Sequence, residues 1–422
     1  MMLQTNKNKL RKRARAEWRF RSYGILSLLF ASTALVFLVS TIVSSGHSAF
    51  FKTTIDFEFP LDAERLGIET PYTWENLWAG SYYTAVKQAL YALFPEVTSR
   101  PDKRALSRML SPGAELELRD YVIAHPDKIG ESVSLEVPVS SDYDQLYKGH
   151  LPRTGKHTKL SAQQMEQFDR LVDEGLIHYR FNPGFLTGGD SRYPELAGIG
   201  GAITGSFYAL LVCFLLSFPL GIAAALYLEE FSKDTRMTRL IEANINNLAA
   251  VPSVIFGLLG LAVILNVFGL PRGTPLVGGM VLALMTLPTI IIACRSSLRA
   301  VSPGIRQGAL AMGASPVQVV FQQVLPAAMP GTLTGTIIGL AQALGETAPL
   351  LMIGMVAFIA NVPATPLDSS ASLPVQIYLW AESAERGFVE KTAAAIIVIM
   401  TFLILMNLLA VIIRSRTQTK VE

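Results

Sequence analysis

Six long apolar stretches alternate with polar segments along the 422-residue chain. A helix that crosses a membrane needs about 20 predominantly apolar residues, so each stretch predicts one membrane-spanning helix. We expect the first span over residues 22–44. The other five are expected over 200–228, 248–270, 276–294, 333–359 and 392–413.

Residues 45–198, between the first two apolar stretches, have a different composition, with many charges, prolines and tyrosines. The segments WENLWAGSYYTAVKQALYALF and SAQQMEQFDRLVDEGL have helical periodicity, whereas SVSLEVPV alternates as a strand does. We therefore predict an all-α polytopic membrane protein with a small mixed α/β domain between helices 1 and 2. This part of the chain is called the insert domain below.

Charge distribution predicts which ends of the spans face the cytoplasm. Residues 1–21 carry eight Lys and Arg against one Glu, and basic residues recur in the segments after the second, fourth and sixth spans, including the tail 415–422. The first apolar stretch is longer than a signal-peptide core and no A-x-A-like cleavage site follows it. We expect an uncleaved first helix, both termini in the cytoplasm and the insert domain outside.

Composition also limits the chemistry. Half of the residues are hydrophobic and only 16% are charged, so an ordinary soluble protein is excluded. There is no G-x-x-x-x-G-K-[ST] phosphate loop, catalytic triad or paired-carboxylate site, so we expect no enzyme, no catalytic residue and no bound cofactor. We also expect no metal, because Cys213 and Cys294 lie in apolar segments and the histidines lack ligand spacing: His47, His125, His150, His157 and His178.

The predicted cytoplasmic loop 295–332 contains two helix starts. Ser302 with Pro303 predicts one helix that ends at Gly313, and Ser315 with Pro316 predicts a second. Gln318 completes a capping box and Pro326 limits continuation of the second helix. Residues 303–326, called the knob below, are thus expected to form two short helices with a tight turn. On periodicity alone they equally fit an amphipathic hairpin that packs only against its own helix ends.

The spacing of three short motifs in the knob favours a docking role. They resemble the cytoplasmic coupling signature of bacterial ABC importer permeases, at Gln307-Gly308-Ala309, Gly313-Ala314 and Leu325-Pro326. The resemblance implies that the knob docks on an ATP-hydrolysing subunit. The family has Glu where this chain has Gln307 and Ala where it has Gly308, so shape and apolar contact are expected to carry the coupling.

Over residues 199–414 the resemblance is to one particular family of ABC importer permeases. The segments VLPAAMPGTLTGTIIGLAQ, LGETAPLLMIG, SLPVQIYLWA and AAVPSVIFGLLG resemble the phosphate transport system permease family PstA, in its long form with an extended periplasmic domain. The resemblance implies the type I ABC importer permease fold. It also implies an inner-membrane location and a phosphate importer built with a second permease (PstC-like), two ATP-binding subunits (PstB-like) that hold the ATP, and a periplasmic phosphate-binding protein (PstS-like).

Other functions remain open at this point. An importer of another oxyanion, such as molybdate, sulfate or phosphonate, is the first alternative, although GETAPLL argues against it. A membrane phosphate sensor would lack an output domain in this chain. A secondary transporter would leave the knob without a role and shows no inverted repeat. Partners other than protein and lipid, such as nucleic acid, are not expected.

One acidic residue lies in the fifth apolar stretch. Glu346 is expected near the middle of that span, where an ionised carboxylate costs about 2.5–3.5 kcal/mol. Pro349 predicts a helix kink that exposes backbone beside Glu346 and Thr347. The family usually has Arg where this chain has Gln342. Two interpretations stay open, namely a translocation pathway or gate, and a structural pairing with a basic group on a neighbouring helix. The positive charge near Glu346 is expected from a partner subunit or from Arg295 and Arg299.

Overall fold

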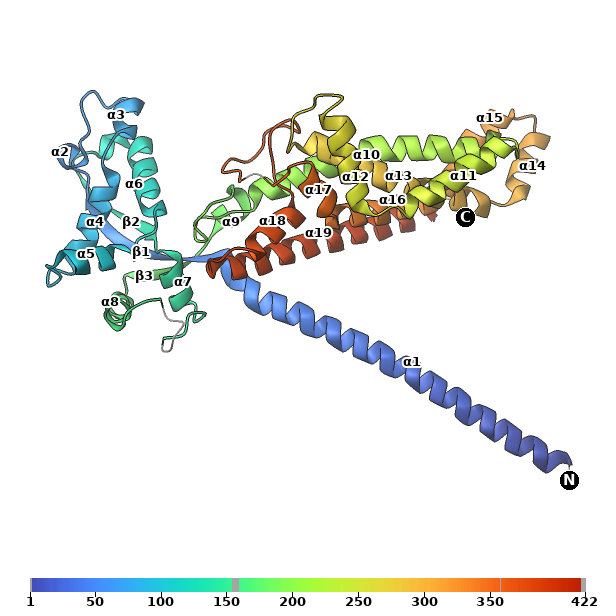
Figure 1. Ribbon diagram of the computed structural model, residues 1–422, viewed down its shortest axis with the longest axis horizontal. Helices are drawn as coiled ribbons and strands as arrows, with labels where there is room; N and C mark the ends of the chain where they lie inside the picture. Colours follow the sequence, from blue (N-terminus) through green and yellow to red (C-terminus); the bar gives the residue numbers. More distant parts are fainter. Residues whose placement is uncertain (1, 154–158, 357, 419–422) are drawn as a thin grey trace.

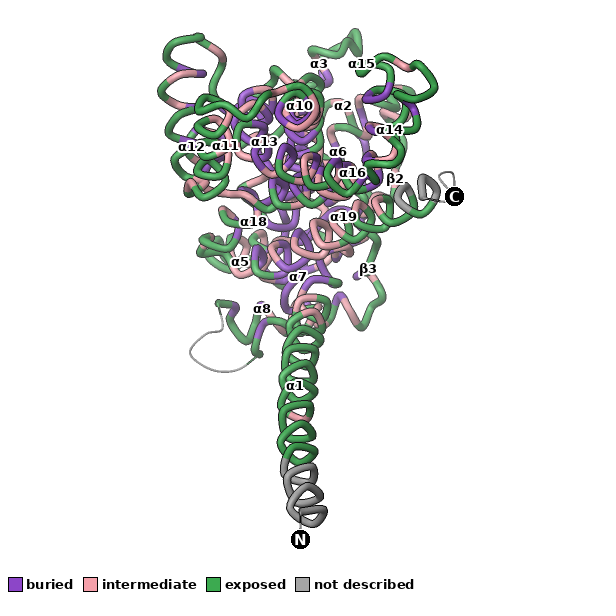
Figure 2. The backbone as a smooth tube through the Cα atoms, turned by 90° about the vertical axis from the view of Figure 1, so that its right-hand side faces the viewer, coloured by how far each residue is buried: buried purple, intermediate pink, exposed green. Residues whose placement is uncertain are grey.

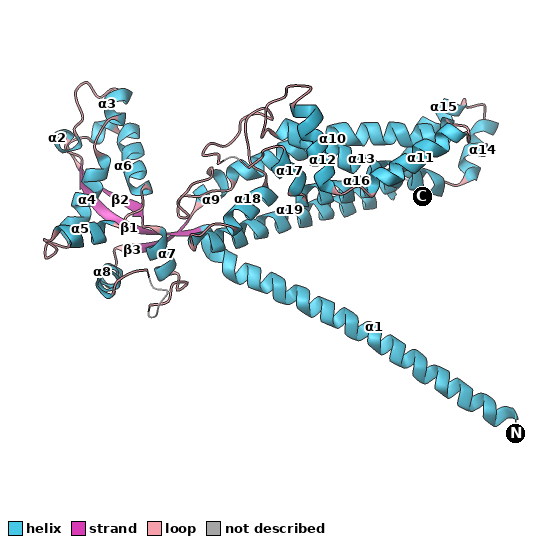
Figure 3. Ribbon diagram, in the orientation of Figure 1, coloured by secondary structure: helices cyan, strands magenta, loops and turns pink. Residues whose placement is uncertain are grey.

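A computed structural model of the chain describes residues 2–153, 159–356 and 358–418. The insert domain lies at one end of an elongated helical core and the knob lies at the other (Figure 1). The long first helix leaves the core where the insert domain joins it. Figure 3 shows that the strands are confined to the insert domain and that the rest of the chain is helical.

The insert domain combines a small sheet with short helices, as predicted. The three strands are in the order β2-β1-β3 and both pairings are antiparallel, with Ile55 opposite Val137 on one side and Ile177 on the other. Its elements are η1 His47–Phe50, β1 Phe51–Pro60, α2 Ala63–Leu66, α3 Trp74–Trp78, α4 Tyr82–Leu93, α5 Arg100–Ser107, α6 Gly113–Ala124, η2 Pro126–Lys128, β2 Ser132–Pro138, α7 Ser141–Tyr147, α8 Ala162–Asp173, β3 Ile177–Phe181 and α9 Pro183–Thr187.

The sequence patterns of the insert domain are confirmed where they were strongest. The segment from Trp74 forms α3 and α4, the segment from Ser161 forms α8, and the alternating run from Ser132 forms β2. Ser161 caps α8 through a complete capping box with Gln164. Burial of every second residue of β1, such as Phe57 and Phe59, gives this domain its own hydrophobic core.

The helical core contains long apolar helices connected by short or broken ones. Outside the core, α1 spans Met2–Gly46. The core elements are α10 Gly200–Leu226, η3 Tyr227–Phe231, α11 Arg236–Ala249, α12 Ser253–Leu259, η4 Gly260–Leu265, α13 Pro275–Ala300, α14 Pro303–Ala311, α15 Pro316–Val319, η5 Val320–Val324, α16 Leu325–Gly345, α17 Ala348–Met352, α18 Leu373–Ala381 and α19 Gly387–Gln418.

Small residues hold the long helices together. At Gly279 of α13, an added Cβ would lie 2.5 Å from the Ala209 carbonyl oxygen of α10, so only glycine permits this approach. Such contacts are typical of helices that pack within a membrane. Figure 2 shows the buried residues concentrated inside the core, while α1 is exposed along most of its length.

Five helices among the described residues are long and apolar enough to cross a membrane, and a sixth is reached by counting one bent pair. The bent pair is α11 with α12 and η4, whose axes differ by 105°. The prediction of a continuous third span over 248–270 is therefore wrong. Pro252 lies in the break, and the apolar helix after it runs only from Ser253 to Leu265.

Candidate functional site

The knob has the local structure that its capping residues predict. Ser302 accepts a hydrogen bond from the Gly304 amide at 3.3 Å and so caps α14, whose first residue is Pro303. After α14, Gly313 has a φ of +85°, a left-handed conformation that other residues adopt with strain. The chain therefore reverses within a few residues.

A complete capping box starts the second helix of the knob. The Gln318 amide donates to Ser315 Oγ at 3.3 Å, and the Ser315 amide donates to Gln318 Oε1 at 2.9 Å. Both bonds satisfy amides that the first helical turn leaves without partners. The entry angle of this helix is thereby fixed.

The prediction that Pro326 limits this helix is wrong. The residues Val320–Val324 form a turn of π-helix, and α16 follows without interruption. Pro326 has no amide hydrogen, and the wider i→i+5 pattern just before it accommodates the missing hydrogen bond. One continuous helix, called the lever below, therefore runs from Pro316 in the knob to Gly345.

The knob exposes several large apolar side chains that no other part of the described chain covers. Met312 is 85% exposed, Val317 53% and Phe321 52%, while Val320 and Val324 are buried. Exposed apolar side chains gathered on one face mark an interaction site more often than an ordinary surface. Some apolar side chains of the knob therefore pack against the chain itself, whereas others stay exposed.

The structure places the predicted coupling residues around this surface. Gln307, Gly308 and Gly313 are exposed, Ala309 is buried beneath them, and Ala314 is half-buried. In the lever, Leu325 is half-buried and Pro326 is exposed. A Cβ added at Gly308 would meet no atom within 4 Å, so the glycine is not required by packing.

One ion pair and two hydrogen bonds fasten the knob to η3, which continues α10, and to the end of α13. Arg306 donates to Glu230 Oε1 at 2.7 Å, and also to the carbonyls of Val301 at 2.7 Å and Leu298 at 2.9 Å. A guanidinium that serves three acceptors at once fixes its orientation as well as its position. The knob is therefore held to two helices of the core.

A second cluster uses the arginines of α13. Arg295 and Arg299 both bind Glu229, at 3.2 Å and 2.7 Å, and Arg295 also reaches Glu242 of α11. These arginines are therefore committed to acids at the knob end of the core. The interpretation that either one pairs with Glu346 is wrong, because Glu346 lies at the far end of the lever.

Glu346 ends a helix instead of lying within one. Its backbone is extended, with φ −76° and ψ 122°, and the next helix, α17, begins at Ala348. Neighbouring Leu344 lines a cavity together with Ile203 and Ser206 from the first two turns of α10. The predicted kink beside Glu346 is thus a complete break in the helix, and it lies toward the end that carries the insert domain.

The surroundings of this break are open and sparsely bonded. A Cβ added at Gly345 would meet no atom within 4 Å. Among the described residues, no side chain forms a hydrogen bond or ion pair with the half-buried carboxylate of Glu346. Thr347 is half-buried beside it, Pro349 is buried, and Gln342 is exposed one turn earlier.

A second break lies beside the first. A Cβ at Gly257 of α12 would lie 2.7 Å from Pro349 Cα, and one at Gly260 would lie 3.2 Å from Ile353. Gly257 thus lies beside Pro349, and Gly260, three residues later, lies beside Ile353. The two segments therefore run in the same direction, and the breaks that precede them lie at the same end. Interrupted helices of this kind supply polar backbone inside transport proteins.

The ion pairs of Arg306 and Arg295 and the break before Ser253 were not predicted from the sequence. The break before Ser253 had a signal in Pro252, but the partners of Arg306 and Arg295 lie far from them along the chain and have no local pattern. Within the described residues, no group of three potential metal ligands occurs. His157 and residues 419–422 of the predicted tail lie outside the described residues.

Two different protein families match the two halves of the chain. Residues 217–419 match the family described as binding-protein-dependent transport system inner membrane component, and residues 7–157 match a domain of unknown function, DUF3333. Phosphate transport system permease protein PstA 1 of Mycobacterium tuberculosis is 30% identical over 51% of this chain and 70% of its own length. The corresponding PstA of Pasteurella multocida is 28% identical over 51% of this chain and 76% of its own length.

Among solved structures, the inward-facing MetNI methionine ABC transporter is similar with a TM-score of 0.42. The sequence identity is 18%, over 52% of this chain and 94% of the other.

Proposed function

Because the chain belongs to the PstA family of phosphate transport permeases, we propose that it is one of two permease subunits of an ATP-driven importer of inorganic phosphate. In this proposal the knob faces the cytoplasm and docks on an ATP-binding subunit, and the insert domain faces outward. The second permease subunit completes the pathway, and a binding protein delivers phosphate. The ATP is bound by the partner subunits.

The exposed apolar face of the knob carries this proposal. Met312, Val317 and Phe321 lie on a part of the chain that extends beyond the bundle of apolar helices (Figure 1). Burial of one such side chain contributes about 1.5–3 kcal/mol. A groove on a partner that receives two of them gains about 3–6 kcal/mol toward docking.

The lever gives the docking a mechanical consequence. One helix connects the docking surface to the break at Glu346, over 30 residues. At 1.5 Å per residue it is about 45 Å long. When ATP-driven closure of the ATP-binding subunits displaces the knob, the far end of the lever moves as well. The break next to it then opens toward the other side of the membrane.

The ion pairs at this end of the core make the knob and the core helices move together. Arg306 connects the knob to α10 through Glu230, and Arg295 connects α13 to α10 and α11. The core helices therefore follow the knob instead of sliding past it. This behaviour suits alternating access, in which rigid elements rock about a central site.

The break at Glu346 is the proposed gate. A carboxylate repels a phosphate anion, so Glu346 is a poor direct ligand for it. It acts instead by accepting the proton of hydrogen phosphate or by holding a cation supplied by the second permease. Thr347 and the free backbone of the break provide neutral hydrogen-bonding groups along the same path.

Co-purification with the cognate ATP-binding subunit tests the docking. We expect the Val317→Asp/Phe321→Asp variant to insert into the membrane but to retain at least tenfold less ATP-binding subunit. The matched control is Gln323→Asp, which adds a charge to the same helix without removing an apolar contact. Equal retention by the double variant and the control would refute the docking role.

A further inference from the structure

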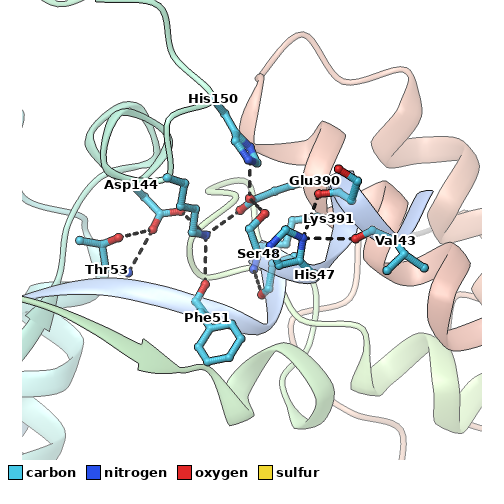
Figure 4. A network of polar contacts seen from close by, with 12 residues as sticks. Val43, His47, Ser48, Phe51, Thr53, Asp144, His150, Glu390 and Lys391 are labelled. Atoms are coloured by element: carbon cyan, nitrogen blue, oxygen red, sulfur yellow. Dashed lines mark hydrogen bonds and ion pairs between the residues drawn. The ribbon is translucent and has the colours of Figure 1, made fainter. Parts of the chain in front are cut away.

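The insert domain joins the helical core through a buried cluster of charges (Figure 4). Lys148 follows α7 of the insert domain, and its Nζ lies 2.7 Å from Asp144 Oδ2 and 2.9 Å from Glu390 Oε1. It also donates to the Phe51 carbonyl at 3.0 Å. Because Glu390 belongs to the first turn of α19, this lysine bridges the two parts of the molecule.

Both carboxylates are fully engaged. Asp144 Oδ1 accepts hydrogen bonds from the Thr53 amide at 3.0 Å and the Thr53 hydroxyl at 2.7 Å. Glu390 Oε2 accepts one from Ser48 Oγ at 2.8 Å. The side chains of Lys148 and Glu390 are each only 2% exposed. A buried ion pair needs this degree of satisfaction to offset the cost of removing charges from water.

A second buried lysine lies in the same cluster. Lys391 donates to the Ala49 carbonyl at 3.3 Å, and its Nζ lies 4.6 Å from the centre of the Phe185 ring. Its charge interacts with those of Glu390, Asp144 and the nearby buried Glu195, so the two lysines offset the acids around them. His150 lies at the rim of the cluster, with Nδ1 3.8 Å from Glu390 Oε2.

The backbone around the charges is packed without spare room. A Cβ added at Gly387 would lie 2.4 Å from Ser141 Oγ, and one at Gly46 would lie 2.7 Å from the Ala393 backbone. The insert domain, the end of α1 and the start of α19 therefore meet in close contact. Loss of one charge would leave its partner buried and uncompensated, so the cluster strongly favours a single arrangement.

Beyond the junction, α19 packs along α16, the long part of the lever. The lever ends at Gly345, beside the proposed gate. A displacement of α19 is consequently transmitted to the same helix that the knob moves from its other end.

We propose that Lys148 and Glu390 are positioning residues of the transport cycle. They fix the insert domain to α19 as one rigid body, so that docking of the external phosphate-binding protein on the insert domain shifts α19 against the lever. The identity of this docking partner rests on the proposed function. The rigidity of the junction rests only on the contacts described above.

Distances between spin labels test the rigidity without any transport assay. Labels at the exposed positions Gln163 of α8 and Ala384, just before α19, report on the two sides of the junction in the full chain, with Cys213 and Cys294 replaced by alanine. We expect one narrow distance distribution in the unaltered junction and a broad one in Glu390→Gln. That substitution keeps the acceptor for Ser48 but removes one of the two carboxylate partners of Lys148.

The charge-balanced variant Glu390→Gln/Lys391→Met provides the rescue. We expect it to regain a narrow distribution, because it removes one negative and one positive charge together. An unchanged distribution in Glu390→Gln, or a double variant that stays as broad as the single one, would overturn the proposal. A single variant that fails to fold while the double variant folds would support charge balance as the cause.

Stimulation of ATP hydrolysis by the binding protein tests the transmission. In the reconstituted transporter we expect Glu390→Gln to abolish this stimulation while basal hydrolysis is retained, and the double variant to restore it. Full stimulation in Glu390→Gln would overturn the transmission. If the chain serves a different solute, the spin-label result is unaffected, so failure of the proposed function is distinguishable from failure of the junction.

Discussion

Arg306 of the knob and Glu230 of η3, which continues α10, form an ion pair of 2.7 Å, although 76 residues separate them in the sequence. Both side chains are largely shielded from solvent, with 25% and 11% exposure. The pair links the knob to the first helix of the core. The knob carries the surface that is proposed to dock on the ATP-binding subunit. It therefore connects docking to movement.

Loss of this pair should uncouple hydrolysis from transport. We expect Arg306→Gln to keep the ATP-binding subunit bound but to lower phosphate uptake per ATP hydrolysed, because a charge-assisted hydrogen bond of about 1.5–3 kcal/mol is lost. The measurement is uptake and hydrolysis on the same proteoliposomes. Arg239→Gln, which removes an exposed pair with Asp234, should change neither. An uptake-to-hydrolysis ratio unchanged by Arg306→Gln would argue against the connection.

Two glycines of the knob should respond in opposite directions to alanine. Gly308→Ala places a methyl group in open space inside α14 and should stabilise that helix by about 0.5–1 kcal/mol. Gly313→Ala forces a left-handed conformation on alanine and should destabilise the turn by about 1–2 kcal/mol. Amide hydrogen exchange in α14 measures both effects. Slower exchange in Gly313→Ala would contradict the assigned conformation.

A buried acid of the insert domain predicts a dependence on pH. Glu195 accepts a hydrogen bond from Ser111 at 2.7 Å, but its burial raises the pKa of its carboxyl above the ordinary value of 4.5. The ionised carboxylate therefore destabilises the folded domain above that raised pKa, and the penalty fades as the pH falls toward 4.5.

We expect Glu195→Gln to melt at a higher temperature than the original chain at pH 7, with the difference vanishing near pH 4.5. Glu166→Gln, at an exposed position, should show no such trend. Thermal unfolding of the full chain, followed by tryptophan fluorescence, makes the comparison. A constant difference at all pH values would exclude titration of Glu195 as its origin.

The gate role of Glu346 makes a separate prediction. Glu346→Gln should leave assembly intact and reduce phosphate uptake at least tenfold, because the site loses its charge and its proton acceptor. Glu382→Gln, at an exposed position outside the helices, should transport normally. Normal uptake by Glu346→Gln would favour a structural role for this acid.

Local signals in the sequence predicted much of the fold and the knob. Ser315 and Gln318 form the predicted capping box, Gly313 adopts the predicted left-handed turn, and most apolar stretches form long helices. These features depend on residues within one or two helical turns. The two errors arose where a proline has more than one possible effect: Pro326 follows a π-helical turn without ending the helix, whereas Pro252 lies in a sharp bend.

Long-range contacts could not be predicted from one sequence. Lys148 and Glu390 are 242 residues apart, and each taken alone resembles a solvated surface charge. Hydropathy alone also extends the fifth apolar stretch across the helix end at Gly345. Contacts of this kind are determined by how helices pack, which the order of residues along one helix does not reveal.

Uptake by the reconstituted transporter tests the central claim most directly. Proteoliposomes that contain the chain, its second permease and the ATP-binding subunits, with the binding protein outside and ATP on the knob side, should accumulate phosphate, and excess sulfate or molybdate should not compete. The Val317→Asp/Phe321→Asp variant should abolish this accumulation, whereas Gln323→Asp should not. Accumulation of sulfate or molybdate in place of phosphate, or phosphate uptake that persists in the double variant, would contradict the account.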